Sequence, residues 1–208
     1  MRFSIFLLIF ALTCSFSNAK ELKIDFSDKG MKLLKKKGGF GGKKTIYTNG
    51  KDQNGDYYLK AVADGSAGGI GMKLEKKLLS EMPYLSMTFK IQKDFERIDQ
   101  TTRAFHDYTA KIVLGKISKI GSKVVSLAHS SFLDEGFSNP SPWTSGSVDV
   151  IVSSDNSKSW HTKKVNVRDI LKKIHDIEFT TGIIFFTDSN NSGQKVIAYY
   201  KNIVFSSD

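Results

Sequence analysis

The feature that most constrains this chain is the alternation of apolar and polar side chains in many short segments. In residues 85–92, Leu, Met, Phe and Ile occupy the odd positions, while Ser, Thr, Lys and Gln occupy the even ones. Successive side chains of a β-strand point to opposite faces, so this segment predicts a strand with one face in water. Similar patterns predict further strands at residues 57–63, 70–74, 108–114, 124–128, 148–152, 182–187 and 196–205.

Turn-forming residues separate these segments, and only one stretch has helical spacing. Turns are expected at residues 48–50, 53–56, 64–65 and 139–142, which are rich in Asn, Asp, Gly and Pro. A helix is expected where apolar residues from Val167 to Ile177 recur at helical spacing, with Asn166 as its N-cap. The run 183–186 is apolar on both faces, so we expect it at the centre of a sheet.

These elements together predict the fold class and the domain organisation. Many short strands with turn signals and one short helix are typical of an all-β protein, here a jelly-roll-like two-sheet β-sandwich. No repeat, low-complexity segment or linker divides residues 20–208, so we expect a single β-sandwich domain there.

Residues 1–19 have the layout of a secretory signal peptide. Arg2 precedes an apolar run, and Ser17 and Ala19 place small side chains at the positions that signal peptidase recognises. The run is shorter than an ordinary transmembrane helix, and no later stretch is apolar enough to be a transmembrane segment. We therefore expect export to the periplasm or the extracellular space. Lipidation at Cys14 is disfavoured, because Thr13 is large for the position before a lipidated cysteine.

The net charge of +10 bears on possible partners. Lysines flank the glycine-rich segment 38–42 and recur at 163–164 and 172–173, where they could attract a phosphate or an acidic glycan. The simpler interpretation is a solvated lysine-rich surface. No nucleic acid partner is expected, because the chain lacks a recognition helix and an aromatic RNA-binding motif.

One loop has the spacing of a calcium site. Asp188, Asn190, Ser192 and Gly193 occupy the first, third, fifth and sixth positions, where alternate oxygen ligands and a glycine suit a hard cation. Tyr199, however, stands where the bidentate glutamate of such a loop would be. Calcium is thus a possible cofactor with Asp188, Asn190 and Ser192 as metal ligands, and a hairpin turn is the alternative. No other cofactor is expected.

Catalytic machinery has no positive signature in the sequence. The chain lacks a nucleophile elbow and a zinc-protease helix motif, and its single cysteine lies in the predicted signal peptide. His106 and Asp107 are neighbours on an expected strand, so their side chains should point apart. An enzyme would need His106 or His129 to converge with Tyr199 and a lysine in one cleft.

Aromatic side chains offer another route to ligand binding, since sugar rings stack on them. Trp143 lies in a loop rich in proline and serine, which suits an exposed platform. Trp160 precedes a strand, and we expect it in the core, where aromatic rings are usually found. Asp107, Trp143 and Tyr199 are the residues we expect to contact a ligand, whereas the catalytic residues are unknown.

The order of several motifs resembles that of the exported bacterial domain of unknown function 3047 family. Residues 107–112 are similar to its Asp-Asp-Tyr-x-Ala-Arg motif, with His106 replacing an aspartate and Lys111 replacing the arginine. Residues 187–193 resemble its Thr-Asp-Thr-Asp-Asn-Thr-Gly motif, with Asn190 in place of the second aspartate. The resemblance implies an exported β-rich sandwich but no activity.

Three functions remain open from the sequence. The leading hypothesis is an exported, non-enzymatic β-sandwich that binds a glycan or another extracellular polymer. The second is a lyase-like enzyme acting on acidic polysaccharide, in which a histidine or tyrosine removes a proton beside a uronate. The third is a structural envelope protein that binds a protein partner through an exposed apolar patch.

Overall fold

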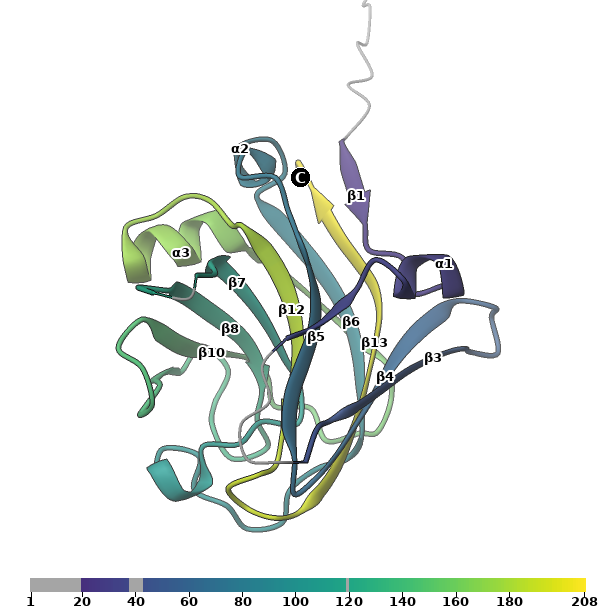
Figure 1. Ribbon diagram of the computed structural model, residues 1–208, viewed down its shortest axis with the longest axis vertical. Helices are drawn as coiled ribbons and strands as arrows, with labels where there is room; N and C mark the ends of the chain where they lie inside the picture. Colours follow the sequence, from purple (N-terminus) through teal and green to yellow (C-terminus); the bar gives the residue numbers. More distant parts are fainter. Residues whose placement is uncertain (1–19, 38–42, 119) are drawn as a thin grey trace, which may run out of the picture.

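The protein is a sandwich of two β-sheets. The computed structural model describes residues 20–37, 43–118 and 120–208, and two sheets pack face to face within them (Figure 1). Strands prevail and the helices are few and short, which confirms the predicted all-β sandwich. The predicted signal peptide, including Cys14, lies outside the described residues. No helix in the described ranges is both long and apolar enough to cross a membrane.

Sheet A has six strands in the order β11-β6-β13-β4-β3, and β1 also pairs with β13. Every pairing in this sheet is antiparallel. Its strands are β1 (Glu21–Lys23), β3 (Ile46–Lys51), β4 (Tyr57–Asp64), β6 (Tyr84–Lys93), β11 (His161–Asn166) and β13 (Lys195–Ser206).

Sheet B has seven strands in the order β2-β5-β12-β7-β8-β10-β9. Its pairings are antiparallel except for β8 with β10, which run parallel. Its strands are β2 (Lys35–Lys37), β5 (Ala67–Lys73), β7 (Lys111–Lys116), β8 (Lys123–His129), β9 (Ser138–Pro140), β10 (Ser147–Ser153) and β12 (Gly182–Asp188). The doubly apolar run 183–186 lies in β12, between β5 and β7, as predicted.

The core lies between the sheets and follows the period of two. Leu85, Met87 and Phe89 of β6 are buried and meet residues such as Ile112 and Phe185 from sheet B in one hydrophobic cluster. The side chains between them face outward, away from the core. Each sheet therefore presents an outer face, and a ligand has two sheet faces on which it could bind.

Short helices fill the ends of the sandwich. The predicted helix is present as α3 (Val167–His175), and the Asn166 side chain accepts a hydrogen bond from the Asp169 amide at 3.1 Å. Val167 and Leu171 are buried on the inner side of α3, and the helix packs on β8 and β6. The other helices are α1 (Asp28–Met31), α2 (Leu78–Glu81) and the 3-10 turn η1 (Arg103–Phe105).

Several local expectations are wrong. Residues 139–140 of a predicted turn lie in β9, and the strand expected over residues 108–114 begins only at Lys111. Residues 48–50, predicted as a turn, lie inside β3, where Gly50 leaves room for the ring of Tyr58: a Cβ at Gly50 would lie 2.5 Å from the Tyr58 hydroxyl. The loop after Asp188 is not a hairpin turn, because β12 belongs to sheet B and β13 to sheet A. Its turn-forming residues carry the chain from one sheet to the other.

Candidate functional site

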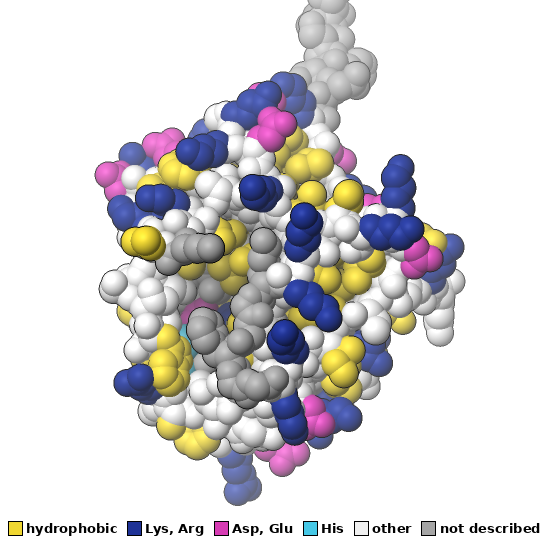
Figure 2. All heavy atoms as spheres, viewed as in Figure 1, with side chains coloured by type: hydrophobic (Ala, Val, Ile, Leu, Met, Phe, Trp, Pro, Cys, Tyr) yellow, Lys and Arg dark blue, Asp and Glu magenta, His cyan; other side chains and the backbone are white. Residues whose placement is uncertain are grey.

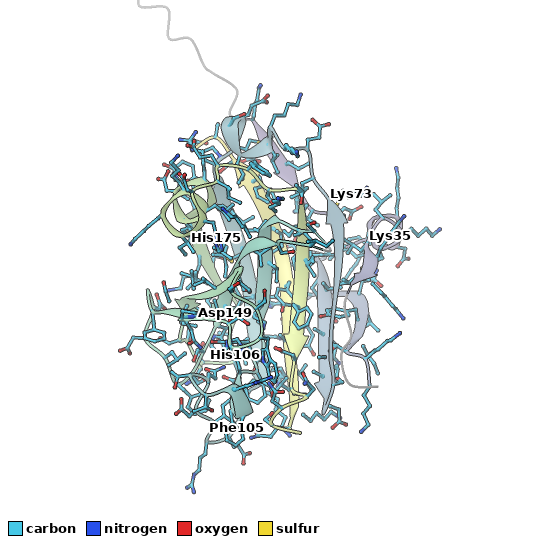
Figure 3. The ribbon with its side chains drawn as sticks, turned by 60° about the vertical axis from the view of Figure 1, so that its left-hand side comes forward. Lys35, Lys73, Phe105, His106, Asp149 and His175 are labelled. Atoms are coloured by element: carbon cyan, nitrogen blue, oxygen red, sulfur yellow. The ribbon has the colours of Figure 1, made fainter. Side chains whose placement is uncertain are left out.

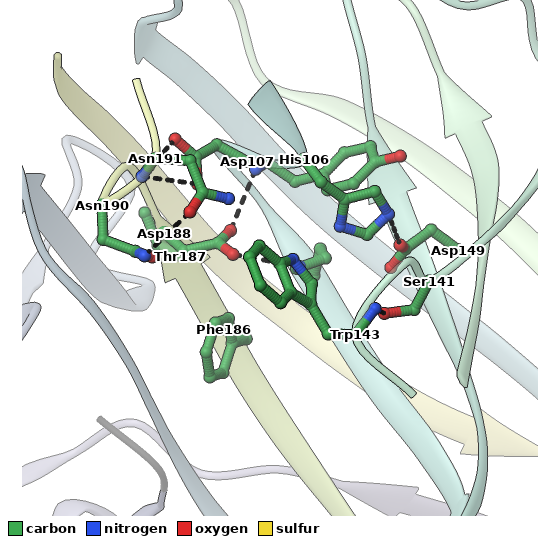
Figure 4. A network of polar contacts seen from close by, with 12 residues as sticks. His106, Asp107, Ser141, Trp143, Asp149, Phe186, Thr187, Asp188, Asn190 and Asn191 are labelled. Carbon is green, nitrogen blue, oxygen red and sulfur yellow. Dashed lines mark hydrogen bonds and ion pairs between the residues drawn. The ribbon is translucent and has the colours of Figure 1, made fainter. Parts of the chain in front are cut away.

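Two sequence motifs far apart in the chain meet on the outer side of sheet B. The backbone amide of Tyr108 donates a hydrogen bond to Asp188 Oδ1 at 2.9 Å, and Lys111 Nζ lies 3.3 Å from Asp188 Oδ2 (Figure 4). The backbone amides of Asn191 and Ser192 donate to Asp107 Oδ2 at 3.1 and 2.7 Å. The segment around Asp107 thus holds the loop after β12 at two places, at Asp188 where the loop begins and at Asn191 and Ser192 farther along.

A histidine–aspartate pair lies on the same outer side. His106 Nε2 is 3.1 Å from Asp149 Oδ2 of β10, and both side chains are buried (Figure 3). Asp107 points away from His106 to the loop after β12, so the two neighbours do not pair with each other, although they precede β7 and are not on the expected strand. We call His106, Asp107, Tyr108, Lys111, Asp149 and Asp188 the motif network.

The charged groups of the motif network shift one another's pKa values. Burial, together with the negative charges of Asp107 and Asp149, raises the pKa of Asp188 to about 6 despite the nearby Lys111 ammonium. Burial disfavours the charge on Lys111, but the attraction of Asp188 and Asp149 outweighs it and keeps the pKa of this lysine above its ordinary value. The network therefore holds one carboxyl that changes protonation close to neutral pH.

The side chains of the predicted calcium ligands do not point toward one common position. Both oxygens of Asp188 face Tyr108 and Lys111, the Asn190 amide donates to the Asn191 side chain, and the Ser192 hydroxyl donates to the Ser189 carbonyl. Among the residues that the structure describes, no group of three or more His, Cys, Asp or Glu side chains is placed to hold a metal ion. Calcium binding stays a prediction, which calcium titration of the wild type and of Asp188→Ala would test.

Trp143 is exposed, as the sequence predicted, on the loop between β9 and β10. Its side chain is 53% accessible, and the Arg103 guanidinium lies 4.2 Å from the ring centre. Figure 2 shows one face of the molecule, on which a small area of acidic and histidine side chains lies beside hydrophobic ones. Asp107, by contrast, is fully buried with its carboxylate bound to backbone amides. Ligand contact by Trp143 or by Asp107 stays a prediction.

The outer face of sheet A carries a cluster of three aromatic rings, and Tyr199 is one of them. The Tyr58 ring centre lies 5.3 Å from that of Tyr199 and 6.3 Å from that of Trp160. Trp160 and Tyr199 lie 6.2 Å apart, and all three side chains are partly exposed. We call Tyr58, Trp160 and Tyr199 the aromatic cluster. The expectation that Trp160 lies in the core is wrong, because it precedes β11 at an outward-facing position.

Sheet register explains why these rings meet. Tyr199 of β13 is opposite Lys60 of β4 and Lys90 of β6, and Tyr200, the next residue, is in the core. His161 is opposite Phe89 at the start of β11, so Trp160 comes beside Lys90. Residues from four strands or their ends therefore share one outward-facing row.

Three lysines surround the aromatic cluster. Lys90 Nζ lies 4.7 Å from the Tyr199 ring centre and 5.1 Å from that of Trp160. Lys60 Nζ lies 5.6 Å from the Tyr199 ring centre, and Lys201 Nζ lies 4.8 Å from that of Trp160. Ammonium groups at these distances are attracted by the electron-rich ring faces. The cluster is thus both aromatic and basic.

A pocket adjoins the aromatic cluster along the same strands. It has a volume of about 780 Å³, and its walls include Gln92 of β6 and Ile197 of β13. Ile197 is two residues from Tyr199, which corresponds to about 7 Å along a strand. Asn156 and Lys158, from the loop that leads to Trp160, also line the pocket. The pocket therefore begins two residues from Tyr199 on the same strand.

Comparison with known proteins assigns the chain to a family. The family model of "Protein of unknown function (DUF3047)" matches residues 36–204. The chain belongs to the DUF3047 family. This confirms the resemblance that the motifs suggested. No curated protein matches the sequence.

Solved structures similar to this DUF3047 protein show the fold. The family 11 carbohydrate-binding module of the cellulosomal cellulase Lic26A-Cel5E of Clostridium thermocellum aligns with a TM-score of 0.50 and 12% identity, covering 91% of this chain and 95% of that one. The Clostridium thermocellum family 11 module in complex with a β-1,3-1,4-mixed-linked tetrasaccharide aligns with a TM-score of 0.50 and 13% identity, covering 89% and 94%. Such low identity establishes a shared jelly-roll sandwich and no more.

Asp94 and Ser131, which line the pocket, meet the buried side chain of His129 in this DUF3047 protein. His129 Nε2 lies 3.1 Å from Asp94 Oδ2, and Ser131 donates a hydrogen bond to the same carboxylate. In a nucleophilic triad, the serine and the aspartate engage opposite nitrogens of the histidine. Here both approach Nε2, while Nδ1 is buried without a hydrogen-bond partner. This arrangement fixes the Asp94 loop and does not activate Ser131.

His106 and Tyr199 do not meet in one cleft, as an enzyme would require. His106 belongs to the outer side of sheet B, whereas Tyr199 lies on the outer face of sheet A. His129 lines a small cavity within the core, beside Phe89 and Ile112. The sandwich therefore separates the residues whose meeting would have supported a lyase.

Sequence reasoning missed Tyr58 and Trp160 as members of the candidate site. Tyr58 occupies a polar-facing position of an alternating strand, which was a usable signal for an outward aromatic ring. Its proximity to Trp160 had no local signal, because the two residues are about one hundred positions apart in the sequence.

Proposed function

We propose that this protein binds a glycan on the outer face of sheet A. The observation that carries the proposal is the aromatic cluster, in which Tyr58, Trp160 and Tyr199 come from separate segments to one partly exposed surface. Aromatic rings with a few polar groups around them are typical of ligand sites, and the apolar face of a sugar ring can stack on them.

The surroundings of the aromatic cluster support an extended ligand. The adjoining pocket of about 780 Å³ offers Gln92 and Asn156 as hydrogen-bonding groups. A sugar that contacts Tyr199 could continue over Ile197 into this pocket without leaving the strands. The shared fold with a module solved in complex with a tetrasaccharide is consistent with this function. Export through the predicted signal peptide would bring the protein to such a polymer.

The two tryptophans allow a direct test, because they lie near different sheets and the chain has no others. Trp143→Phe leaves Trp160 as the sole tryptophan, and Trp160→Phe leaves Trp143. We would titrate both variants with neutral and acidic polysaccharides and record tryptophan fluorescence. A glycan bound at the aromatic cluster should change the emission of Trp143→Phe and leave that of Trp160→Phe unchanged.

Affinity measurements complete the test. Trp160→Ala or Tyr199→Ala should weaken binding by about tenfold or more, because each stacked ring contributes on the order of 1 kcal/mol or more. Trp143→Ala is the matched control and should bind as the wild type does. If only Trp143 responds in the fluorescence titrations, the site lies beside sheet B and the proposal is wrong. If no polysaccharide binds, the glycan-binding function itself is wrong.

A further inference from the structure

We infer that the glycan recognised on sheet A is acidic, carrying carboxylate or sulfate groups that pair with Lys60 and Lys90. This inference rests on the proposed function and names its ligand class. It starts from the position of the lysine ammonium groups, which lie over the same rings that a sugar would contact.

Lys201 differs from the other two lysines because its charge is already balanced. Its ammonium forms ion pairs with Asp52 and Asp56. Burial disfavours the charge on Lys201, but the hydrogen bonds with these carboxylates outweigh it and hold the pKa of the lysine above its ordinary value. Lys201 is therefore part of the scaffold that supports Trp160.

Lys60 and Lys90 have no such partner in the described part of the chain. Among residues 20–37, 43–118 and 120–208, no carboxylate lies within ion-pair distance of either ammonium, and each contacts aromatic rings instead. Both side chains are partly exposed. Their positive charges are thus concentrated on Tyr199 and open to an anion from solvent.

The same geometry disfavours a neutral sugar. A neutral sugar that stacks on the ring faces beside Lys90 would displace the ammonium from two cation–π contacts and gain no charge pairing in return. An acidic sugar can keep Lys90 beside the rings and use it as an ion partner, so its binding adds an interaction instead of replacing one. Charge complementarity therefore selects an anionic glycan.

The experiment compares glycans that share a backbone and differ in charge. We would measure affinity for polygalacturonate and for its methyl ester, and then for chondroitin sulfate and unsulfated chondroitin, by isothermal titration calorimetry. Binding of polygalacturonate and unsulfated chondroitin identifies the carboxylate as the ligand group, whereas binding of chondroitin sulfate alone identifies the sulfate. Raising the salt from about 50 to about 500 mM should weaken binding, because screening reduces exposed charge pairing.

Variants assign the effect to the two lysines. The double variant Lys60→Gln/Lys90→Gln should lose about tenfold in affinity for the acidic glycan, as expected for two partly exposed ion pairs. Lys60→Arg/Lys90→Arg keeps both charges and should retain affinity, which also shows that the face tolerates substitution. Lys164→Gln is the matched control, because Lys164 contacts the Tyr84 ring on the same face outside the cluster.

The outcomes separate this inference from the proposed function. If the methyl ester or a neutral glucan binds as tightly as polygalacturonate and still perturbs Trp160, glycan binding stands and the acidic preference is wrong. An equal loss of affinity in Lys164→Gln would show that any lysine on this face attracts the acidic glycan, and it would also overturn the inference. If no glycan perturbs Trp160, the proposed function fails first.

Discussion

Asp188 shows how burial changes the chemistry of one residue. Its carboxyl group is enclosed between the Tyr108 amide and the Lys111 ammonium, with two further aspartates in the same network. Burial and these negative charges raise its pKa to about 6, although Lys111 opposes the shift. The folded protein therefore binds a proton at Asp188 more tightly than the unfolded chain does.

The raised pKa of Asp188 predicts how stability depends on pH. The stabilising effect of protonation is fully present below pH 3.8 and is lost as pH rises to about 6. Asp188→Asn keeps a neutral side chain at every pH, so the wild type should lose up to about 3 kcal/mol relative to this variant between about pH 4 and pH 7. Urea denaturation of both proteins across this range measures the difference.

The exposed carboxylate at Asp134 offers a control for this measurement. Asp134→Asn, measured over the same pH range, shows what the removal of a solvent-exposed carboxylate does by itself. If the Asp188→Asn and wild-type stabilities run parallel from about pH 4 to pH 7, Asp188 is charged throughout and its pKa is not raised.

Strand β3 shows how a single glycine can decide the environment of a ring on the next strand. Gly50 is opposite Tyr58 of β4, and a Cβ there would lie 2.5 Å from the tyrosine hydroxyl and 2.7 Å from the ring. The turn-like sequence Thr48-Asn49-Gly50 is therefore compatible with a strand, because the missing side chain makes room for Tyr58. That ring then reaches Tyr199 in the aromatic cluster.

Gly50→Ala should displace the Tyr58 ring and weaken glycan binding at the aromatic cluster. We expect about a threefold to tenfold loss of affinity, since one of three ring contacts shifts while Trp160 and Tyr199 remain. Gly68→Ala is the matched control, because the nearest atom to its new methyl group would be 3.7 Å away. Wild-type affinity in Gly50→Ala, with Gly68→Ala unchanged as well, would show that Tyr58 does not contact the ligand.

At the scale of the whole molecule, the sandwich keeps the motif network and the aromatic cluster apart. The motif network lies on the outer side of sheet B, and the aromatic cluster lies on the outer face of sheet A. The hydrophobic core between them joins both sheets into one cluster. A ligand on sheet A therefore contacts a rigid surface whose shape is set by the core.

A glycan that binds only the folded sandwich should raise its melting temperature. At a ligand concentration of about one hundred times Kd, the gain is about 2.7 kcal/mol, which corresponds to about 5 to 10 °C for a domain of this size. Differential scanning calorimetry with and without the glycan measures the shift. Trp143→Ala should keep this shift and Trp160→Ala should lose about half of it or more, whereas an undiminished shift in Trp160→Ala would place the ligand elsewhere.

Local pattern was sufficient to predict most of the elements. Alternation in residues 85–92 predicted a strand whose odd positions are buried, and the doubly apolar run 183–186 predicted a central strand. Asn166 and the helical spacing after it predicted α3 and its cap. These predictions succeeded because the period of side chains along a strand or helix is set by backbone geometry, which acts between neighbouring residues.

What the sequence by itself determined is thus the class of fold and, within the alternating strands, which side chains face outward. Only the tertiary structure decided that Tyr58 and Trp160 join Tyr199, and that the motif at Asp107 holds the loop after Asp188. The physical reason is that strand order and register depend on how all the strands bury their apolar faces together. Alternation along one strand carries no information about which strand lies beside it.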